Sequence, residues 1–414
     1  MLDIKFIREN KKFIEKGASD KSVPIDLDKL LAVDSQRRRL QAELEKLRSQ
    51  RKKIAEEKEI TKGKKIKEEI RAVENKLEKI NAEFYELMLE VPIPPASDVP
   101  KGKTDEDNVE VKFWGEKLKF DFIPKDYITI MESLDLLDLK RGAKIGGFRQ
   151  YVIKNQAVLL EQALLRWSLD YLIKKDFSPF RPTIMVRDFA LVGTGMFPRG
   201  KDDIYMVDDN LYLAGTTEVP LMAYHADEVF DEKELPKKYV GISEAFRREV
   251  GSYGKDIKGI FRIHEFWQTE QVVICKNNEA ESIRWHDELL RNSEGLVQAL
   301  GLPYRIVNCC TGELADGQVK RYDIEIWVPS QGRYRETHSD SYLADFQTRR
   351  LNIRYRTKDG ETKFAHSLNN TGVAVPRILI PLVENYQQKD GSVVIPEVLR
   401  EYTGFSEIRP KNRS

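Results

Sequence analysis

The sequence has few of the residues that bind metals or form disulfides. It contains three cysteines and five histidines in 414 residues. The cysteines, Cys275, Cys309 and Cys310, form no C-x-x-C pair. Without a C-x-x-C pair, and with histidines too sparse to complete a Cys/His cluster, the sequence argues against a structural zinc and against a disulfide framework. We therefore expect no zinc, and a protein of the reducing cytosol.

Long apolar runs and a charge excess are also missing. No stretch of roughly 18 apolar residues occurs, so we expect no membrane span. The first residues, MLDIKFIRENKKF, lack the apolar core of a secretory signal. The net charge is only +1, from 69 basic and 68 acidic residues, so any nucleic-acid site must come from local separation of charge. No Rossmann or P-loop glycine motif follows a strand-like run.

Two apolar seams with coiled-coil spacing lie between residues 33 and 87. Steps of four and three residues alternate in each seam, and the polar stretch EEKEITKGKK separates them. We expect an antiparallel helical hairpin over about residues 28–91, with a length on the order of 45 Å. The first seam is Val33, Leu40, Leu44, Leu47 and Ile54, with Arg37 and Arg51 in two of its positions; the second is Ile66, Ile70, Val73, Leu77, Ile80, Phe84 and Leu87.

Positive charge is concentrated around the turn of this hairpin. Residues 46–67 hold ten Lys or Arg against three Glu. Positive charge at the end of a long helical hairpin, called the basic tip below, suits binding to a phosphate backbone. A dimerisation coiled coil, or a merely solvated charged face, remains an alternative. The candidate nucleic-acid contacts are Arg48, Arg51, Lys52, Lys53, Lys64 and Lys65.

Prolines end the helical pattern at residues 91–108, so we expect a linker there and domains of residues 1–105 and 106–414. In the second domain a helix is expected around residues 155–175 and a last helix over residues 372–388. Short strand-like runs with few helices between them favour an antiparallel sheet flanked by helices, an α+β fold. These runs are residues 203–207, 211–215, 239–246, 261–275, 304–310, 322–328 and 352–357.

The stretch AFRREVGSYGKDIKGIFRIHEFWQTEQ, residues 245–271, has the most chemical content. It predicts a strand, a Gly-containing loop and a returning strand. Arg247 and Glu249 lie two residues apart and so share a strand face. An Arg fork can bridge a carboxylate and a phosphate, Phe266 offers a flat surface for a base, and Glu270 can accept from an ammonium. An ordinary charged hairpin is the alternative.

This FRxE, loop, RxHxFxxxE arrangement resembles the second signature motif of class II aminoacyl-tRNA synthetases. The remaining motifs follow the seryl-tRNA synthetase family in order over essentially the whole chain. They are the N-terminal MLDIKFIRENKKF, DNVEVKFWGE at 107–116, LAGTTEVPL at 213–221, TGEL to GRYRE at 311–336, FQTRR at 346–350, and NNTGVAVPRILIPLVENYQQ to IPEVLREY at 369–402.

The resemblance implies roles for individual residues. It implies that serine is bound by Thr216, Thr217, Glu218, Arg247, Glu270, Asn369 and Thr371. It implies that ATP is bound by Arg247, Arg248, Glu249, Ile263, Phe266, Glu336, Thr337, His338, Ser339 and Arg377, with Glu336 and Ser339 holding Mg²⁺. The basic tip would then bind tRNA(Ser), and also tRNA(Sec). Pro182 would be the first-motif proline at a homodimer interface.

The sequence also departs from the family pattern. His338 is unusual in ETHSDS, Tyr342 replaces an expected Asn, Thr371 stands where Ser is common, and Asp176 and Ser178 loosen the first motif. Two other functions compete with this interpretation. A ligase that loads a carrier protein lacks the helical arm, which is present here. A non-catalytic relative would be expected to lack Arg247, Glu249, Glu270 or Arg377, and all four are present.

Overall fold

The computed structural model describes residues 1–56, 60–250, 256 and 258–410. Contacts within the chain divide it into two compact units, Met1–Pro94 and Pro95–Ser414. The segment after Pro95 bonds to the second unit: Ala96 N donates to Val319 O at 2.9 Å, and Gly312 N donates to Gly102 O at 3.0 Å. The expected linker therefore packs with the second unit, whereas the predicted boundary lay at 105/106. No helix of the described residues is long and apolar enough to cross a membrane.

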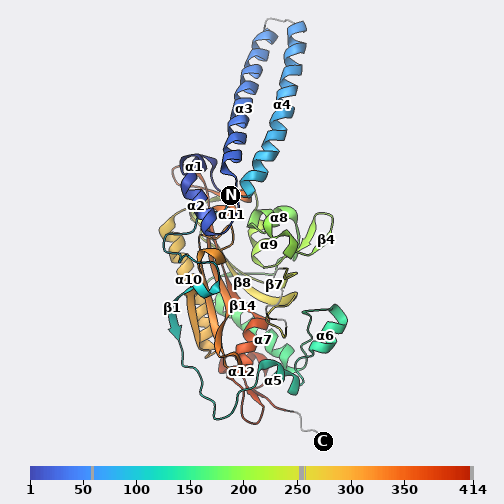
Figure 1. Ribbon diagram of the computed structural model, residues 1–414, viewed down its shortest axis with the longest axis vertical. Coiled ribbons are helices and arrows are strands. Elements are labelled where there is room, and N and C mark those ends of the chain that lie inside the picture. Colours follow the sequence, from blue (N-terminus) through green and yellow to red (C-terminus); the bar gives the residue numbers. More distant parts are fainter. Residues whose placement is uncertain (57–59, 251–255, 257, 411–414) are drawn as a thin grey trace. The chain divides into compact units, whose positions relative to one another are not determined.

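The first unit is a helical hairpin on a small base (Figure 1). Its helices are α1 (Ile4–Glu9), α2 (Lys11–Asp20), α3 (Leu27–Glu56) and α4 (Ile60–Leu89). The predicted hairpin is confirmed, and each long helix has 30 residues. All twelve predicted apolar seam residues lie in one buried or partly buried cluster between α3 and α4. Arg37, in a seam position, stacks over Phe84 at 4.3 Å.

The base of the hairpin is fixed by a buried carboxylate. Asp34 of α3 accepts from Arg8 of α1 at 2.8 Å and from Arg37 at 3.1 Å. Burial alone would raise the pKa of Asp34, but the hydrogen bonds from these two arginines lower it below its usual range. The carboxylate therefore stays ionised and ties α1 to α3.

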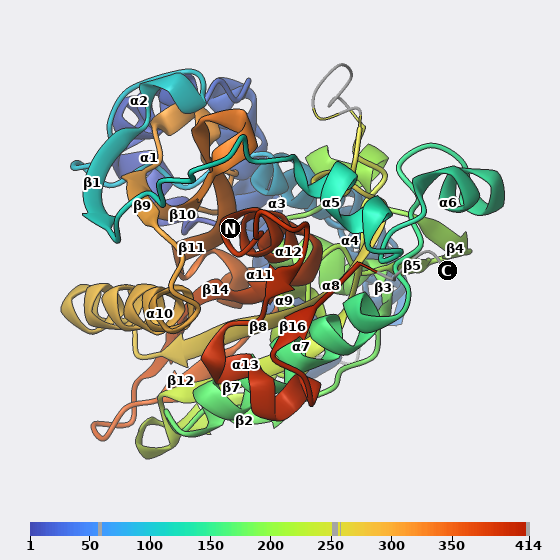
Figure 2. The ribbon, with the colours of Figure 1, turned by 90° about the horizontal axis from the view of Figure 1, so that it is seen from below.

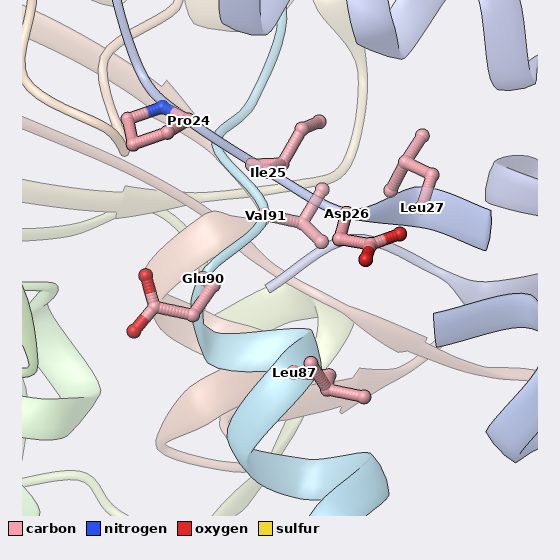
Figure 3. Close-up of a pocket in the computed structure, with 7 residues that line it drawn as sticks. All are labelled: Pro24, Ile25, Asp26, Leu27, Leu87, Glu90 and Val91. Carbon is pink, nitrogen blue, oxygen red and sulfur yellow. The ribbon is translucent and has the colours of Figure 1, made fainter. Parts of the chain in front are cut away.

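A pocket of about 360 Å³ lies in the first unit where the chain enters α3 and leaves α4 (Figure 3). Its lining is mainly apolar, with the carboxylates of Asp26 and Glu90 at its edge. It contains none of the residues predicted to bind a substrate. The lining is Pro24, Ile25, Asp26, Leu27, Leu87, Glu90 and Val91.

The seam packing gives a stability prediction. Ile70 is 4% exposed within the seam. Ile70→Ala should destabilise the first unit by roughly 2–4 kcal/mol, because it removes buried methylenes and leaves a cavity. The measurement is the loss of helical circular dichroism on heating. The neighbouring exposed Glu69→Ala should change stability by less than about 0.5 kcal/mol. Equal unfolding temperatures for both variants would contradict the role of the seam in stability.

The second unit is built on an eight-stranded sheet in the order β1-β9-β10-β11-β14-β8-β7-β2. All neighbours are antiparallel except β2 and β7. The predicted α+β fold with an antiparallel sheet is thus confirmed. The strands are β1 (Val109–Trp114), β2 (Ser178–Phe180), β7 (Lys237–Phe246), β8 (Glu265–Cys275), β9 (Tyr304–Asn308), β10 (Lys320–Val328), β11 (Arg333–Ala344) and β14 (His366–Ala374).

Alternate residues of β8 pack against different helices, which defines the two faces of the sheet. Val273 packs with Leu289 of α10, whereas Val272 packs with Leu221 of α9. The α10 face also carries α7 and α12, and Figure 2 shows these helices beside the strands. The helices of this face are α5 (Tyr127–Ser133), α7 (Gln156–Ile173), α10 (Glu279–Ala299), α12 (Val375–Asn385) and α13 (Glu397–Thr403).

Smaller elements cover part of the other face. They are α8 (Asp188–Thr194), α9 (Glu218–Ala223) and α11 (Phe346–Arg350), with one small sheet of β3 (Met185–Arg187), β4 (Met206–Asp208) and β5 (Leu211–Leu213), and another of β6 (Val229–Asp231), β12 (Arg354–Arg356) and β13 (Thr362–Phe364). The remaining elements are α6 (Leu139–Gly146) and the pair β15 (Val393–Val394) and β16 (Glu407–Ile408).

Several elements differ from the expectation. The helix predicted over 372–388 begins at Val375 and ends at Asn385, and it is not the last, since α13 follows. Its Pro376 lies at the helix start, where a missing N–H costs nothing. The central strands β11 and β14 and the 21-residue helix α10 were not expected. The run 203–207 becomes β4, which begins only at Met206.

Candidate active site

The predicted strand–loop–strand motif forms β7, a connecting loop and β8. Loop residues 251–255 and 257 lie outside the described residues. The pairing continues one residue beyond β7, because Arg247 N donates to His264 O at 2.9 Å and His264 Nδ1 lies 2.9 Å from Arg247 O. Arg247 is therefore held by the same ladder that orients β8.

Strand register gathers the predicted serine-binding residues on one face. Glu270 of β8 is opposite Thr371 of β14, and Asn369 lies two residues before Thr371 on the same face. On its other side Glu270 is opposite Gly241 of β7. A Cβ at Gly241 would lie 2.3 Å from Thr217 Cγ2. Glycine therefore lets the start of α9 approach the sheet closely.

The start of α9 carries the threonines and the acid predicted from LAGTTEVPL. Thr217 is fully buried, and its Oγ1 lies 2.8 Å from Ser243 Oγ and accepts from Gln268 Nε2 at 3.1 Å. Thr217 thus ties α9 to the sheet. Glu218 accepts from Gln347 Nε2 at 2.7 Å. Thr216 Oγ1 accepts from Glu218 N at 3.2 Å.

Two buried carboxyl groups dominate the electrostatics of this pocket. Burial raises the pKa of Glu218 to about 7, and the hydrogen bond from Gln347 and the charge of Arg247 oppose this rise. Burial, followed by the charge of Glu218, raises the pKa of Glu270 well above its usual value. Neither acid forms an ion pair with a Lys or Arg in the described part of the chain. A pocket with two such acids is suited to a cationic group supplied from outside.

A second group of side chains lines a small pocket, called the slot below. The slot is lined by Glu249, Phe261, Ile263, Phe266, Pro376 and Arg377. The guanidinium of Arg247 lies 5.3 Å from the Phe266 ring centroid, and that of Arg377 lies 5.2 Å from the Phe261 ring centroid. Aromatic faces and guanidinium planes are surfaces on which a base can stack. All six lining residues come from two of the motifs predicted to bind ATP, 245–271 and 369–388.

Arg377 lines this slot, and Arg247 lies beside its Phe266 ring. Arg247 Nε donates to Gly215 O at 2.9 Å, which aims its guanidinium across the site. Burial, and then the charge of Arg377, lower the pKa of Arg247. Arg377 Nη1 donates to Glu336 Oε1 at 2.7 Å. Two half-buried cations in one site favour the binding of an anion there.

A bulge in β11 decides which side chains of ETHS face the site. Glu336 is opposite Glu325 and Ser339 is opposite Asp323, with Thr337 skipped in the pairing. Since Asp323 and Glu325 share a face of β10, Glu336 and Ser339 share that face too. His338 is opposite Ile324, on the core face, where its Nε2 lies 3.0 Å from Gly372 O. This geometry does not favour contact between His338 and ATP. The ATP-binding roles of His338 and Thr337 stay predictions.

The residues predicted to hold Mg²⁺ fit a hard cation. Burial alone would raise the pKa of Glu336, but the charges of Arg377 and Arg321 lower it to about 2, so this carboxylate is ionised at neutral pH. Asp323, on the same face, is buried and its Oδ1 has no hydrogen-bond partner in the structure. These oxygens and the Ser339 hydroxyl are donors that Mg²⁺ prefers. No group of three His, Cys, Asp or Glu arranged for a metal occurs in the described residues.

Three arginines near the slot were not predicted as site residues. Arg149 and Arg262 lie 3.7 and 3.2 Å from Glu249 Oε2. Arg335 Nη2 lies 2.7 Å from Asp256 Oδ1. Arg262 is part of the RxHxF motif and could have been found from the sequence. Arg149 lies far from the motif along the chain, and no sequence signal pointed to it.

The other predicted residues lie as follows. Arg248 is exposed, and its backbone N donates to Asp203 O at 2.9 Å. Pro182 is half-buried between β2 and β3. The six candidate nucleic-acid contacts are all exposed, on the last two turns or so of α3 and the second turn of α4, and Arg48 also pairs with Glu74 at 2.9 Å. The turn at 57–59 between these helices lies outside the described residues.

Comparisons with known proteins agree along the whole chain. The model of the class II tRNA synthetase core domain (G, H, P, S and T) matches residues 204–386, and that of the seryl-tRNA synthetase N-terminal domain matches residues 1–94. The serine–tRNA ligase of Deinococcus radiodurans is 44% identical over 99% of both chains. That of Pyrococcus horikoshii is 40% identical over 99% of this chain and 98% of its own.

Solved structures give the same result. The seryl-tRNA synthetase of Pyrococcus horikoshii complexed with ATP has a TM-score of 0.92 and 39% identity, covering 99% of this chain and all of its own. The cytoplasmic serine–tRNA ligase of Naegleria fowleri in complex with AMP has a TM-score of 0.90 and 32% identity, covering 100% and 99%. Since these relatives match over full length, the chain belongs to the seryl-tRNA synthetase family of class II aminoacyl-tRNA synthetases.

Proposed function

We propose that the protein uses ATP to activate L-serine and then transfers the seryl group to the 3′ end of tRNA(Ser). The observation that carries this proposal is that two buried acids, Glu218 and Glu270, lie in the same site as the half-buried cation of Arg247. A free amino acid presents an ammonium and a carboxylate within a few ångströms of each other. A pocket with acids on one side and a guanidinium on the other is complementary to both.

The serine pocket follows from this polarity. Glu218 and Glu270 receive the ammonium, with Thr216 and Asn369 beside them. Arg247 holds the carboxylate. Thr371 stands directly across from Glu270, and supplies a hydroxyl near the serine side chain. Thr217, bonded to Ser243 and Gln268, supports α9 from behind.

ATP occupies the slot beside this pocket. Its base lies on Phe266, with Glu249 accepting from the adenine amino group and Ile263 offering backbone groups. Arg377 covers the other side and reaches the phosphates. Arg247 contacts the α-phosphate as well as the serine carboxylate, so one guanidinium holds both reacting groups together.

In the first step a serine carboxylate oxygen attacks the α-phosphorus, a new P–O bond forms, and the bond to the β,γ-diphosphate breaks. The products are seryl-adenylate and pyrophosphate. No general base is required, since the serine carboxylate is already ionised at pH 7. Arg247 stabilises the charge that builds up on the α-phosphoryl oxygens. In the second step a hydroxyl of the terminal tRNA ribose attacks the seryl carbonyl, and AMP leaves.

Mg²⁺ is proposed to bind at Glu336 and Ser339. When bound, it would neutralise phosphate charge and hold the triphosphate bent. Arg377 already pairs with Glu336 at 2.7 Å, and so keeps this carboxylate oriented and ionised.

The pKa of Glu218 predicts a pH dependence for serine binding. Its pKa is raised to about 7, and only the ionised carboxylate attracts an ammonium. As the pH falls below about 7, Glu218 is protonated and the KM for serine should rise by up to roughly ten-fold per pH unit. Steady-state ATP–pyrophosphate exchange from pH 5.5 to 8 measures this. The rise should be absent in Glu218→Gln, which should bind serine weakly at every pH. A KM for serine that is flat across this range would contradict the assignment.

The polar pocket also predicts side-chain specificity. Alanine has no side-chain hydroxyl, so it would leave the Thr371 hydroxyl without a partner, and this penalty should reject it by on the order of a thousand-fold. Threonine should be rejected less strongly, through crowding of its extra methyl. Exchange rates with the two competitors relative to serine measure both ratios. Equal rates with serine and alanine would contradict the pocket assignment.

The macromolecular partners are part of the same proposal. The exposed basic tip of the α3–α4 hairpin supports tRNA binding, with tRNA(Ser) as the substrate and tRNA(Sec) as a second one. We also propose a homodimer through the region of Pro182, and a cytosolic location. Exchange assays with each of the twenty amino acids test the activity itself, and stimulation by an amino acid other than serine would overturn the proposal.

A further inference from the structure

We propose that Arg149 is a positioning residue that fixes the carboxylate of Glu249 and thereby contributes to selection of the nucleotide base. Arg149 lies in a segment of the chain, residues 138–152, that includes α6 (Figure 1) and is called the excursion below. The excursion is closed at its base by the bridge between Leu137 and Ile153 and by Asp138 N donating to Val152 O at 2.8 Å. Its two ends are therefore anchored, and its inner residues are presented at a fixed place.

Burial in this excursion is the reverse of the usual pattern. Ile145 is 80% exposed and Phe148 is 58% exposed. The Arg149 side chain that follows them is only 5% exposed. Arginine is rarely buried without a partner or a task, and apolar side chains usually occupy such positions. The loop therefore buries a cation where packing alone would favour one of its apolar neighbours.

The buried cation faces the nucleotide slot. Arg149 Nη1 lies 3.7 Å from Glu249 Oε2, and Arg262 Nη1 lies 3.2 Å from the same oxygen. Glu249 itself is part of the slot lining. Arg262 comes from the motif that carries Glu249, whereas Arg149 comes from outside it. Two guanidinium groups from separate segments thus restrict the rotation of a single carboxylate.

The backbone conformation at both ends of this contact is unusual. Arg149 has φ of 61° and Glu249 has φ of 54°. The left-handed region costs free energy for residues other than glycine, and such residues persist where the surroundings hold them, often at functional sites. Both residues have this conformation at the place where the Arg149 guanidinium approaches the Glu249 carboxylate.

This inference rests on the proposed function, in which Glu249 accepts from the adenine amino group. Adenine presents an N–H donor at that position of the ring, whereas guanine presents a carbonyl oxygen. A carboxylate that is held in place attracts the first and repels the second. A carboxylate that can turn away loses part of both effects. Arg149 should therefore affect ATP affinity and the preference for ATP over GTP, without affecting serine.

The experiment compares Arg149→Ala and Arg149→Lys with Arg141→Ala. Arg141 belongs to the same excursion, but its side chain is 76% exposed and pairs with Asp138. Kinetics of serine-dependent exchange give the KM for ATP and for serine, and calorimetry without serine gives the affinities for ATP and GTP. For Arg149→Ala we expect the KM for ATP to rise on the order of ten-fold, as for a lost charge-assisted contact. The ATP-to-GTP preference should fall, and the KM for serine should stay within about two-fold.

Arg149→Lys keeps the charge but not the planar fork, so it should recover part of the ATP affinity. Arg141→Ala should match the parent protein in every measurement. An Arg149→Ala protein with unchanged ATP affinity and unchanged ATP-to-GTP preference would overturn the inference. So would a loss of turnover with an unchanged KM for ATP. If the parent protein shows no serine-dependent exchange, the proposed function fails, and the affinities for ATP and GTP still decide the role of Arg149.

Discussion

Arg247→Ala should lower serine-dependent ATP–pyrophosphate exchange by roughly three orders of magnitude. In the proposed function this side chain contacts the amino-acid carboxylate and the α-phosphate, so its removal would take a cation from both reacting groups. Burial and the nearby charge of Arg377 already lower the pKa of Arg247. The attraction between this cation and the phosphate should therefore be strongest in the transition state, where negative charge builds up on the phosphoryl oxygens. Its loss should then lower turnover as well as binding.

The fold should survive this substitution. The main loss outside catalysis is the hydrogen bond from Arg247 Nε to Gly215 O, which costs about 1–2 kcal/mol. The backbone pairing with His264 stays, because it uses only main-chain and His264 atoms. Arg247→Lys, which keeps the charge without the fork, should be intermediate. Arg356→Ala, at an exposed position of β12, serves as the control. A folded Arg247→Ala protein that exchanges at near the parent rate would refute the proposed role.

The coiled-coil arm could be predicted in detail because its packing is local. A seam with alternating steps of four and three residues can be buried only against a matching seam. The partner seam follows directly along the chain, and all twelve predicted apolar positions are in the observed cluster. The catalytic sheet is different. Its central strands β11 and β14 carry ETHSDS and HSLNNT, polar sequences without the apolar alternation of a strand.

Those polar sequences are strands because both faces of the sheet need polar groups at this point. One face forms the candidate site. On the other face Asn370 Nδ2 donates to Leu289 O of α10 at 2.9 Å, inside a buried polar layer. Tertiary partners, which no local pattern reveals, satisfy these groups. The same reason explains the β11 bulge, which turns His338 to the core and keeps Glu336 and Ser339 together.

The candidate site was predicted where a motif carries its residues close together, as in 245–271. Its remaining parts depend on long-range register. The pairing of Glu270 with Thr371 joins positions about a hundred residues apart, and only the family resemblance pointed to it. Arg149 illustrates the limit of sequence reasoning: it belongs to none of the motifs, and its significance appears only when the folded chain places it beside Glu249.

Replacing the tip of the α3–α4 hairpin should abolish charging of tRNA and leave serine activation intact. The exchange of residues 46–76 for a short Gly/Ser linker removes the basic segment. The seam residues nearer the base of the hairpin stay. The cut points lie opposite each other on α3 and α4, because Arg48 contacts Glu74 and Arg37 contacts Phe84 across the two helices. The candidate site lies within a unit that is compact by itself, Pro95–Ser414. Its exchange activity should therefore stay within about two-fold of the parent protein.

The loss of charging has an electrostatic cause, so it should depend on salt. Each phosphate neutralised by Lys or Arg releases condensed counterion, and the logarithm of affinity falls with the logarithm of salt at a slope of about −0.9 per contact on duplex. The parent protein should lose tRNA affinity steeply between low and physiological salt. The tip replacement should bind weakly with a flatter slope. Filter binding at several salt concentrations gives both slopes, and aminoacylation gives the consequence for turnover.

Charge reversal separates electrostatics from shape. Lys52, Lys53, Lys64 and Lys65 are all exposed, so changing them together to Glu should preserve the hairpin and reproduce the defect in tRNA binding. Lys76→Glu with Lys79→Glu, at exposed positions of α4 farther from the turn, is a control with two reversals instead of four and should bind tRNA more nearly like the parent protein. If the tip replacement charges tRNA as well as the full chain, the hairpin is a dimerisation or scaffolding element. If both charge reversals weaken binding equally, the tip has no special role, and tRNA follows the whole length of the arm.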